Sequence, residues 1–161
     1  MMTVLAAATC CAKAQTTDRS LTEHDAAVRA KDSTIKVDII NPAEQEAGED
    51  AADWAALVQT ITQKYDAVTA DRTITKAKIY YYYGKDWPAF CAGIVNYTDH
   101  YELANDYPLL DKNAAMILKN SDDAAQLKEA LRWSKSASAS DPNNATYKAT
   151  LDGLSTKIAG N

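Results

Sequence analysis

Two small residues and a proline break do most to constrain what this chain can fold into. Ala130 and Ala137 are seven residues apart, or about two helical turns, so both fall on one face of a helix. Small side chains on one face allow a neighbouring helix to approach closely. Asp141 and Pro142 then end that helix, because proline cannot donate the hydrogen bond that a continuing helix needs. The pattern predicts stacked helical hairpins, an architecture that serves as a binding scaffold more often than as a catalyst.

The composition agrees with a folded, helix-rich domain. Of the 161 residues, 47% are hydrophobic, and only five are glycine and four are proline. This balance favours a packed core over disorder. The formal net charge is −5 and no block of Lys or Arg occurs, which argues against a nucleic-acid partner. Most charged residues are therefore expected to form the solvated faces of helices.

From residue 50 onward the apolar residues recur at the spacing of amphipathic helices. Trp54, Leu57, Val58 and Ile61, for example, fall on one stripe of a helix. Turn and capping residues separate one periodic stretch from the next. Six helices are expected, at about 52–66, 73–83, 87–103, 110–119, 123–139 and 145–159.

Residues 80–83 are four consecutive tyrosines, which by intrinsic propensity favour a strand. The helical spacing of Ile74, Ala77 and Tyr81, with Gly84 where a helix would end, favours a helix instead. Consecutive residues point to all sides of a helix, so at least two of these rings must face outward or toward a neighbouring hairpin. Packing between helices is the expected role, and stacking on a ligand is the alternative.

The N-terminal segment 1–14 has the pattern of an export signal. It is small and apolar, and Ala12 and Ala14 form a small-x-small cleavage site. It is shorter than the roughly 20 apolar residues that span a bilayer, and no integral membrane span is expected. The protein is therefore predicted to be exported, to the periplasm or as a secreted protein. A lipoprotein anchor on Cys10 or Cys11 is the alternative.

The following segment, 15–50, is polar and only weakly periodic, so we expect a loosely structured leader. A short helix near 21–31 and a strand over 33–40 are alternatives within it, and Asn41-Pro42 suggests a break. The helical domain is expected to occupy residues 51–160.

No catalytic residue, metal ligand or cofactor site is expected, and the chain is not predicted to be an enzyme. Cleavage after residue 14 would leave Cys91 as the single cysteine, on the apolar side of a helix and therefore inert. His24 and His100 have no partner at metal-ligand or catalytic spacing.

Two stretches resemble parts of a tetratricopeptide repeat. Residues 82–90, Tyr-Tyr-Gly-Lys-Asp-Trp-Pro-Ala-Phe, are similar to its middle, where a Gly-x-Asp-aromatic turn joins two helices. Residues 126–142 resemble its second half, with Ala130 and Ala137 at the small packing positions and Pro142 at the terminal proline.

This resemblance implies an all-α fold, in which antiparallel hairpins stack as a short tetratricopeptide-like solenoid of about six helices. Together with the apolar pattern, it gives the residues that are expected to pack the helices together. They are Trp54, Ala77, Tyr81, Gly84, Trp87, Ala89, Phe90, Ala130, Trp133, Ala137 and Pro142.

In tetratricopeptide arrays the first helix of each hairpin lines a concave groove that holds a peptide or a partner helix. The matching positions here are Thr75, Lys78, Lys112, Met116 and Lys119. The resemblance therefore implies a protein-protein interaction module whose lysines receive an acidic peptide or a free carboxylate. The alternative is that these lysines are ordinary solvated side chains.

A second resemblance concerns the run 77–90 together with 130–134. These residues are similar to the helical region that follows the thioredoxin domain in some exported Bacteroidetes thioredoxin-family proteins. No Cys-x-x-Cys motif is present, so the resemblance implies no redox activity. The alternative function is thus an accessory helical domain, or a fragment, of a thioredoxin-family disulfide oxidoreductase system.

Overall fold

The structure, a computed structural model, describes residues 25–48, 50–102 and 105–160. These residues are helical and include no strand, which confirms the all-α prediction for this part of the chain. They belong to two compact units, Met1–Asp53 and Trp54–Asn161. The expected export segment 1–14 lies outside the described residues.

In the first unit, one continuous helical stretch changes its winding just before a proline. A helix over 25–35 leads into the π-helix η1 (Lys36–Ile40) and then into α2 (Asn41–Ala47). The N–H of Asn41 donates to the carbonyl of Lys36, five residues back. Pro42 explains this widened turn, because proline has no N–H and its ring crowds the carbonyl four residues earlier.

This helical stretch corrects the expected loose leader and the expected break at Asn41-Pro42, and it excludes the strand alternative. The alternative of a short helix near 21–31 agrees with the helix that the structure describes from residue 25. The part of the leader over 15–50 that the structure describes is helical rather than loosely structured. The segment 33–40 is helix and π-helix rather than strand. Pro42 lies in the first turn of α2 directly after the π-helix, and the helical stretch widens there and continues instead of breaking.

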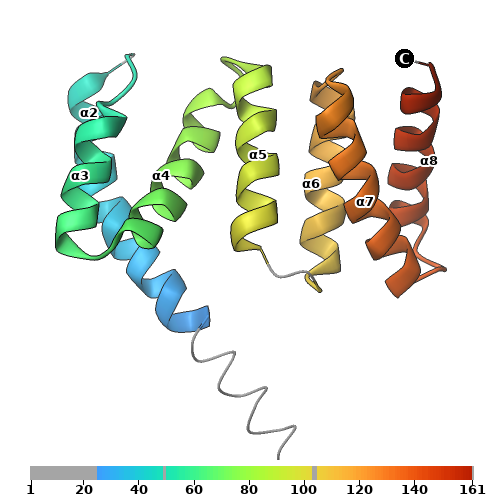
Figure 1. The fold of residues 1–161 in the computed structure, drawn as a ribbon, viewed down its shortest axis with the longest axis horizontal. Coiled ribbons are helices and arrows are strands. Elements are labelled where there is room, and N and C mark those ends of the chain that lie inside the picture. The colour runs from blue at the N-terminus through green and yellow to red at the C-terminus, as the bar shows by residue number, and fades with distance from the viewer. Residues whose placement is uncertain (1–24, 49, 103–104, 161) are drawn as a thin grey trace, which may run out of the picture. The chain divides into compact units, whose positions relative to one another are not determined.

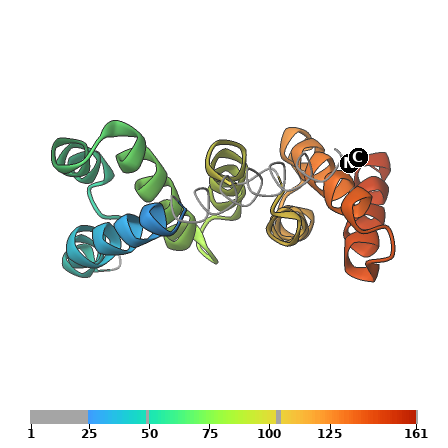
Figure 2. The same cartoon turned by 90° about the horizontal axis from the view of Figure 1, so that it is seen from below.

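The described residues of the second unit form six helices, and Figure 1 shows them following one another side by side. Each helix packs against the next, α6 also packs against α8, and α5 also contacts α7. Figure 2 shows α5 and α6 nearly end-on. The bounds are α3 (Trp54–Lys64), α4 (Ala67–Tyr82), α5 (Trp87–Tyr101), α6 (Tyr107–Asn120), α7 (Ala124–Ser140) and α8 (Ala145–Gly160).

An aspartate side chain caps the start of four of these helices. Each accepts a hydrogen bond from a backbone N–H in the first turn, which satisfies a donor that has no helical partner. The caps are Asp66 for α4, Asp86 for α5, Asp106 for α6 and Asp123 for α7. The cap at Asp66 makes α4 begin at Ala67, earlier than the expected start near residue 73.

The core of this unit lies between α5, α6, α7 and α8. Trp133 is its largest fully buried side chain and is only 2% exposed. Ala130 and Ala137 are completely buried, in agreement with their expected role at close helix contacts. The buried cluster consists of Phe90, Cys91, Ile94, Leu110, Ala114, Ile117, Leu127, Ala130, Trp133 and Leu154.

Trp87 corrects the expectation that both indoles would be enclosed between helix layers. Trp133 is buried, but Trp87 stands 37% exposed at the start of α5. The other positions expected to pack the helices vary. Ala77 and Phe90 are buried, Trp54, Tyr81 and Ala89 are half-buried, and Gly84 and Pro142 are exposed at the ends of helices.

Ala137→Leu tests the close helix contact. The larger side chain is expected to lower the free energy of unfolding by about 1–3 kcal/mol, because the site has no room for it. Urea denaturation followed by circular dichroism measures the change. Ala125→Leu, at an exposed position of the same helix, is the matched control and should change stability by less than about 0.5 kcal/mol. Equal effects of the two substitutions would contradict the packing role.

Candidate functional site

An exposed group of aromatic side chains lies where α4 ends and α5 begins. Tyr80 is 62% exposed and Tyr83 is 58% exposed, and Trp87 follows them across the turn. Phe90, one turn into α5, is buried beneath. We call Tyr83, Trp87 and Phe90 the aromatic cluster, with Tyr80 one turn earlier on the same helix.

The turn between the two helices fixes the positions of these rings. Gly84 has a φ of 74°, a left-handed conformation that residues with a side chain rarely adopt. The N–H groups of Lys85 and Asp86 donate to the carbonyl of Tyr82 at 3.0 and 2.9 Å. Asp86 then caps α5 by accepting from the N–H of Ala89 at 2.9 Å. The chain therefore reverses within a few residues and brings the two ends together.

The three rings of the aromatic cluster meet edge to face. The Tyr83 and Trp87 centroids are 5.5 Å apart with an interplanar angle of 79°, and those of Trp87 and Phe90 are 5.5 Å apart at 85°. Tyr83 also contacts Phe90 at 5.4 Å. Aromatic pairs favour this geometry. The buried Phe90 thus supports two exposed rings in fixed orientations.

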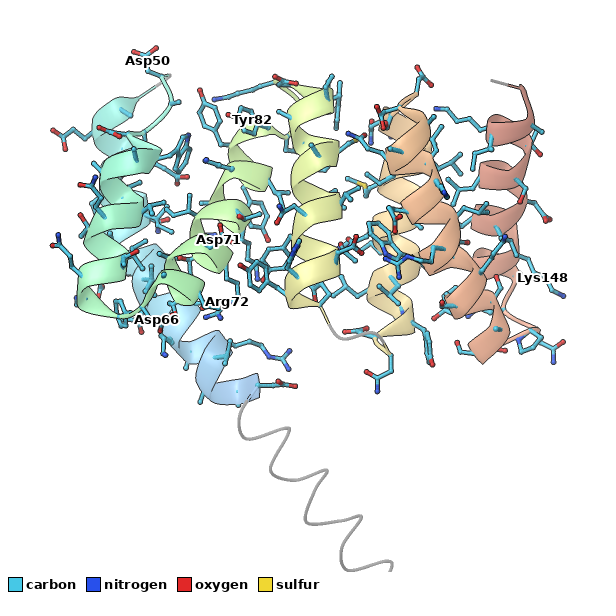
Figure 3. All side chains as sticks on the ribbon, in the orientation of Figure 1. Asp50, Asp66, Asp71, Arg72, Tyr82 and Lys148 are labelled. Carbon is cyan, nitrogen blue, oxygen red and sulfur yellow. The ribbon has the colours of Figure 1, made fainter. Side chains whose placement is uncertain are left out.

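The other two tyrosines of the run, Tyr81 and Tyr82, are half-buried and pack against other side chains. Tyr81 packs edge to face against Trp54 at 5.8 Å and against Tyr82 at 5.2 Å. The Nζ atom of Lys85 lies 4.1 Å from the centroid of the Tyr81 ring, within the range of a cation–π contact. Figure 3 labels Tyr82 at this end of α4. The run therefore divides into two outward and two packed rings, which agrees with its helical assignment.

Further along α4 and α5, polar and aromatic groups join the two helices. The Nζ atom of Lys76 lies 5.5 Å from the centroid of the Tyr97 ring. The hydroxyl of Tyr101 donates to Asp71, labelled in Figure 3 nearer the start of α4. Burial, followed by this hydrogen bond and the charge of Asp71, raises the pKa of Tyr101 to about 12. This hydroxyl stays protonated and serves as a hydrogen-bond donor between the helices.

The five residues expected to bind a partner lie on two separate helices. Thr75 and Lys78 belong to α4 and are half-buried. Lys112 and Lys119 are exposed on α6, whereas the side chain of Met116 packs against the core. Both helices pack against α5, which lies between them in Figure 1. The structure therefore does not bring the two groups together.

The described residues include one cysteine and one histidine, in contrasting surroundings. Cys91 is fully buried, as expected, and burial raises its pKa to about 11, so the thiol is unreactive at neutral pH. His100 is exposed, and its Nδ1 atom is 2.8 Å from the carbonyl oxygen of Asn96. Within 25–48, 50–102 and 105–160, no three His, Cys, Asp or Glu side chains gather as a metal site requires.

The roles of two polar residues, Asp99 and Asp111, were not predicted from the sequence. Asp99 of α5 accepts hydrogen bonds from Arg132 at 2.6 Å and from the indole N–H of Trp133 at 3.1 Å, both on α7. Asp111 of α6 is buried. Its position three residues before the core residue Ala114 was the available signal, because residues three apart lie on one face of a helix. Helical spacing does not give the partner of Asp99.

Comparison with known proteins gives no further information about these residues. No protein-family model, curated protein or solved structure matches the chain. None of the helices that the structure describes combines the length and the apolar character needed to cross a membrane.

Asp99→Ala tests the polar contact between α5 and α7. We expect the free energy of unfolding to fall by about 1 kcal/mol, because the part-buried indole N–H of Trp133 loses its acceptor. Urea denaturation measures the loss. Glu129→Ala is the control, since it removes only the exposed ion pair of Glu129 with Arg132 and should cost less than about 0.5 kcal/mol. A loss at Asp99 no larger than that at Glu129 would contradict this assignment.

Proposed function

We propose that this chain is a non-catalytic protein-protein interaction module that binds a peptide or a partner protein. The observation that carries the proposal is the aromatic cluster with its exposed rings Tyr83 and Trp87. Tyrosine and tryptophan are enriched at the energetic centres of protein interfaces, because they bury large areas and keep a polar group for hydrogen bonding.

The fixed orientation of these rings supports the proposal. Tyr83 and Trp87 both rest on the buried Phe90. The turn between them is held by two backbone N–H groups that donate to the carbonyl of Tyr82. Binding to side chains that are already ordered costs less conformational entropy than binding to free rotamers. The neighbouring Tyr80, also exposed, extends the surface by one helical turn.

A finer form of the proposal is a tetratricopeptide-like solenoid with a concave binding surface. The packing of each helix of the second unit on its successor is compatible with stacked hairpins. In this form an acidic peptide would contact Thr75 and Lys78 on α4 and Lys112 and Lys119 on α6, with Met116 packed beneath them against the core. A free carboxylate would contact only one of these two groups. Substitutions in the aromatic cluster and substitutions of Lys78 and Lys112 show which of the two surfaces binds the partner.

The test uses the full chain as bait on an envelope extract and then purifies the recovered partner for titration. The variant with Tyr83→Ala and Trp87→Ala is expected to weaken binding at least about tenfold, because two anchoring rings are lost. The variant with Lys78→Glu and Lys112→Glu should do the same only if an acidic partner lies along the lysines.

Val68→Ala is the matched control, since Val68 is an exposed apolar residue of α4 away from the turn. Circular dichroism verifies that each variant is folded. A partner whose affinity is unchanged by both double variants, or no recovered partner at all, would refute the proposed binding surfaces.

We also infer that the protein acts outside the cytoplasm, from the export pattern of residues 1–14. After expression in a bacterial host, N-terminal sequencing of the envelope fraction is expected to begin at Gln15. A chain beginning at Cys10 or Cys11 and carrying lipid would support the lipoprotein alternative. An intact N-terminus at Met1 in the cytosolic fraction would contradict export.

A further inference from the structure

One buried polar residue from each of α5, α6, α7 and α8 lies at a similar level of the second unit. In each hairpin the two polar residues are about equally far along the chain from the connecting turn, and antiparallel helices place such residues opposite each other. All four have side chains within the core region. This buried polar layer consists of Thr98, Asp111, Ser134 and Thr150.

Asp111 is the acidic member of the layer, and it is only 4% exposed. Its Oδ1 atom is buried and has no hydrogen-bond partner, and the same is true of the hydroxyl oxygen of Ser134. Thr150 of α8 hydrogen-bonds to the Asp111 carboxyl group. A buried, ionised carboxylate needs several hydrogen-bond donors in place of the water molecules that it loses. Among the described residues, Thr150 is the donor to Asp111.

The hydroxyl of Thr150 has a single proton, which limits what it can do for Asp111. The Oγ1 atom of Thr150 is 3.2 Å from the carbonyl oxygen of Thr146, one helical turn earlier, and donates to it. A neutral Asp111 can donate its own proton to Thr150 while Thr150 donates to Thr146, so both bonds form together. An ionised Asp111 competes with that carbonyl for the same proton.

Among the described residues, no cation contributes to the shift in the pKa of Asp111. Asp99 of α5 and Arg132 of α7 are paired with each other. Tyr147 of α8 feels the negative charges of Asp111, Asp141 and Asp106, which raise its pKa after the effect of burial. These surroundings favour the uncharged acid.

At its other end, α8 is attached by an independent contact. The Nζ atom of Lys157 donates to the carbonyl of Leu118 at 3.1 Å and pairs with Asp122 at 2.8 Å. Between the two ends, Leu154 is fully buried, and a Cβ atom added at Gly153 would lie 2.8 Å from the side chain of Leu118. At Gly153, α8 therefore lies in close contact with α6, and at the level of the polar layer the Oδ1 atom of Asp111 is buried.

We propose that Asp111 makes the packing of α8 against α6 depend on pH, with α8 held closed by the neutral acid and loosened when the acid ionises. Burial raises the pKa of Asp111, and the hydrogen bond from Thr150 lowers it in part. A folded-state pKa above the unfolded value stabilises the closed form fully below the ordinary carboxyl pKa of about 3.9. That stabilisation is lost as the pH rises through the raised value.

Amide hydrogen exchange of the full chain tests the proposal between about pH 4 and pH 8, with rates corrected for intrinsic chemistry. Protection of α8 is expected to fall relative to that of α5 as the pH rises, by up to about tenfold per pH unit across the transition. Asp111→Asn removes the ionisation and should leave α8 protected at every pH. Asp152→Asn, at an exposed position of α8, is the matched control and should behave as the unmodified chain.

A carboxyl-carbon NMR titration gives a second measurement that does not depend on opening of the helix. Asp111 is expected to titrate above the ordinary carboxyl pKa of about 3.9. Titration of Asp111 at or below that value would overturn the proposal. So would a pH dependence of α8 protection that persists unchanged in Asp111→Asn, or one that never separates α8 from α5.

Discussion

Close approach of helices at fully buried small residues is the constraint on which the second unit depends. Ala114, Ala130 and Ala137 have no exposed surface, so α6 and α7 meet with little between them. Trp133 of α7 is buried in the same cluster, with its indole N–H hydrogen-bonded to Asp99 of α5. Close packing at native density makes such contacts sensitive to a single added methylene group. The positions of the neighbouring helices, and hence of the polar layer between them, follow from these alanines.

The repeated aspartate caps supply the second constraint, because they fix where each helix starts. One cap contributes about 1 kcal/mol, and four successive helices of this unit use the same chemistry. In α5 and α6 a proline in the first turn adds a preset backbone angle. Because each helix starts at a defined residue, the loops between successive helices stay short. The turn at Gly84 then holds Tyr83 and Trp87 within contact distance.

The order and approximate bounds of the six helices could be predicted because they depend on local patterns. Apolar spacing, capping residues and the glycine turn all lie within a few residues of the helix boundary that they determine. The start of α4 was predicted too late because its first turns are polar, and the cap at Asp66 was overlooked. The π-helix before Pro42 was missed because helix breaking is the usual expectation for proline, whereas here the helix widens and continues.

The character of individual surfaces could not be predicted in the same way. Helical spacing says that Trp87 and Phe90 share a face, but not that a neighbouring helix covers only Phe90. It places Asp111 on the same face as the core residue Ala114, but it does not give the hydrogen bond from Thr150 of α8. Both outcomes depend on how distant helices meet, which no local pattern contains.

Trp87 and Asp111 break the general rule that apolar groups are buried and charged groups are solvated. An exposed indole costs solubility, and a buried carboxyl group costs solvation free energy. Neither residue is needed to build the helix in which it lies, since Asp86 caps α5 and the apolar face of α6 is complete without Asp111. In most proteins the apolar pattern, turns and caps all favour the observed fold. Residues that break this agreement tend to lie where the protein binds a partner or changes state. A surface for a partner and an acid that responds to pH are the two roles that these violations fit.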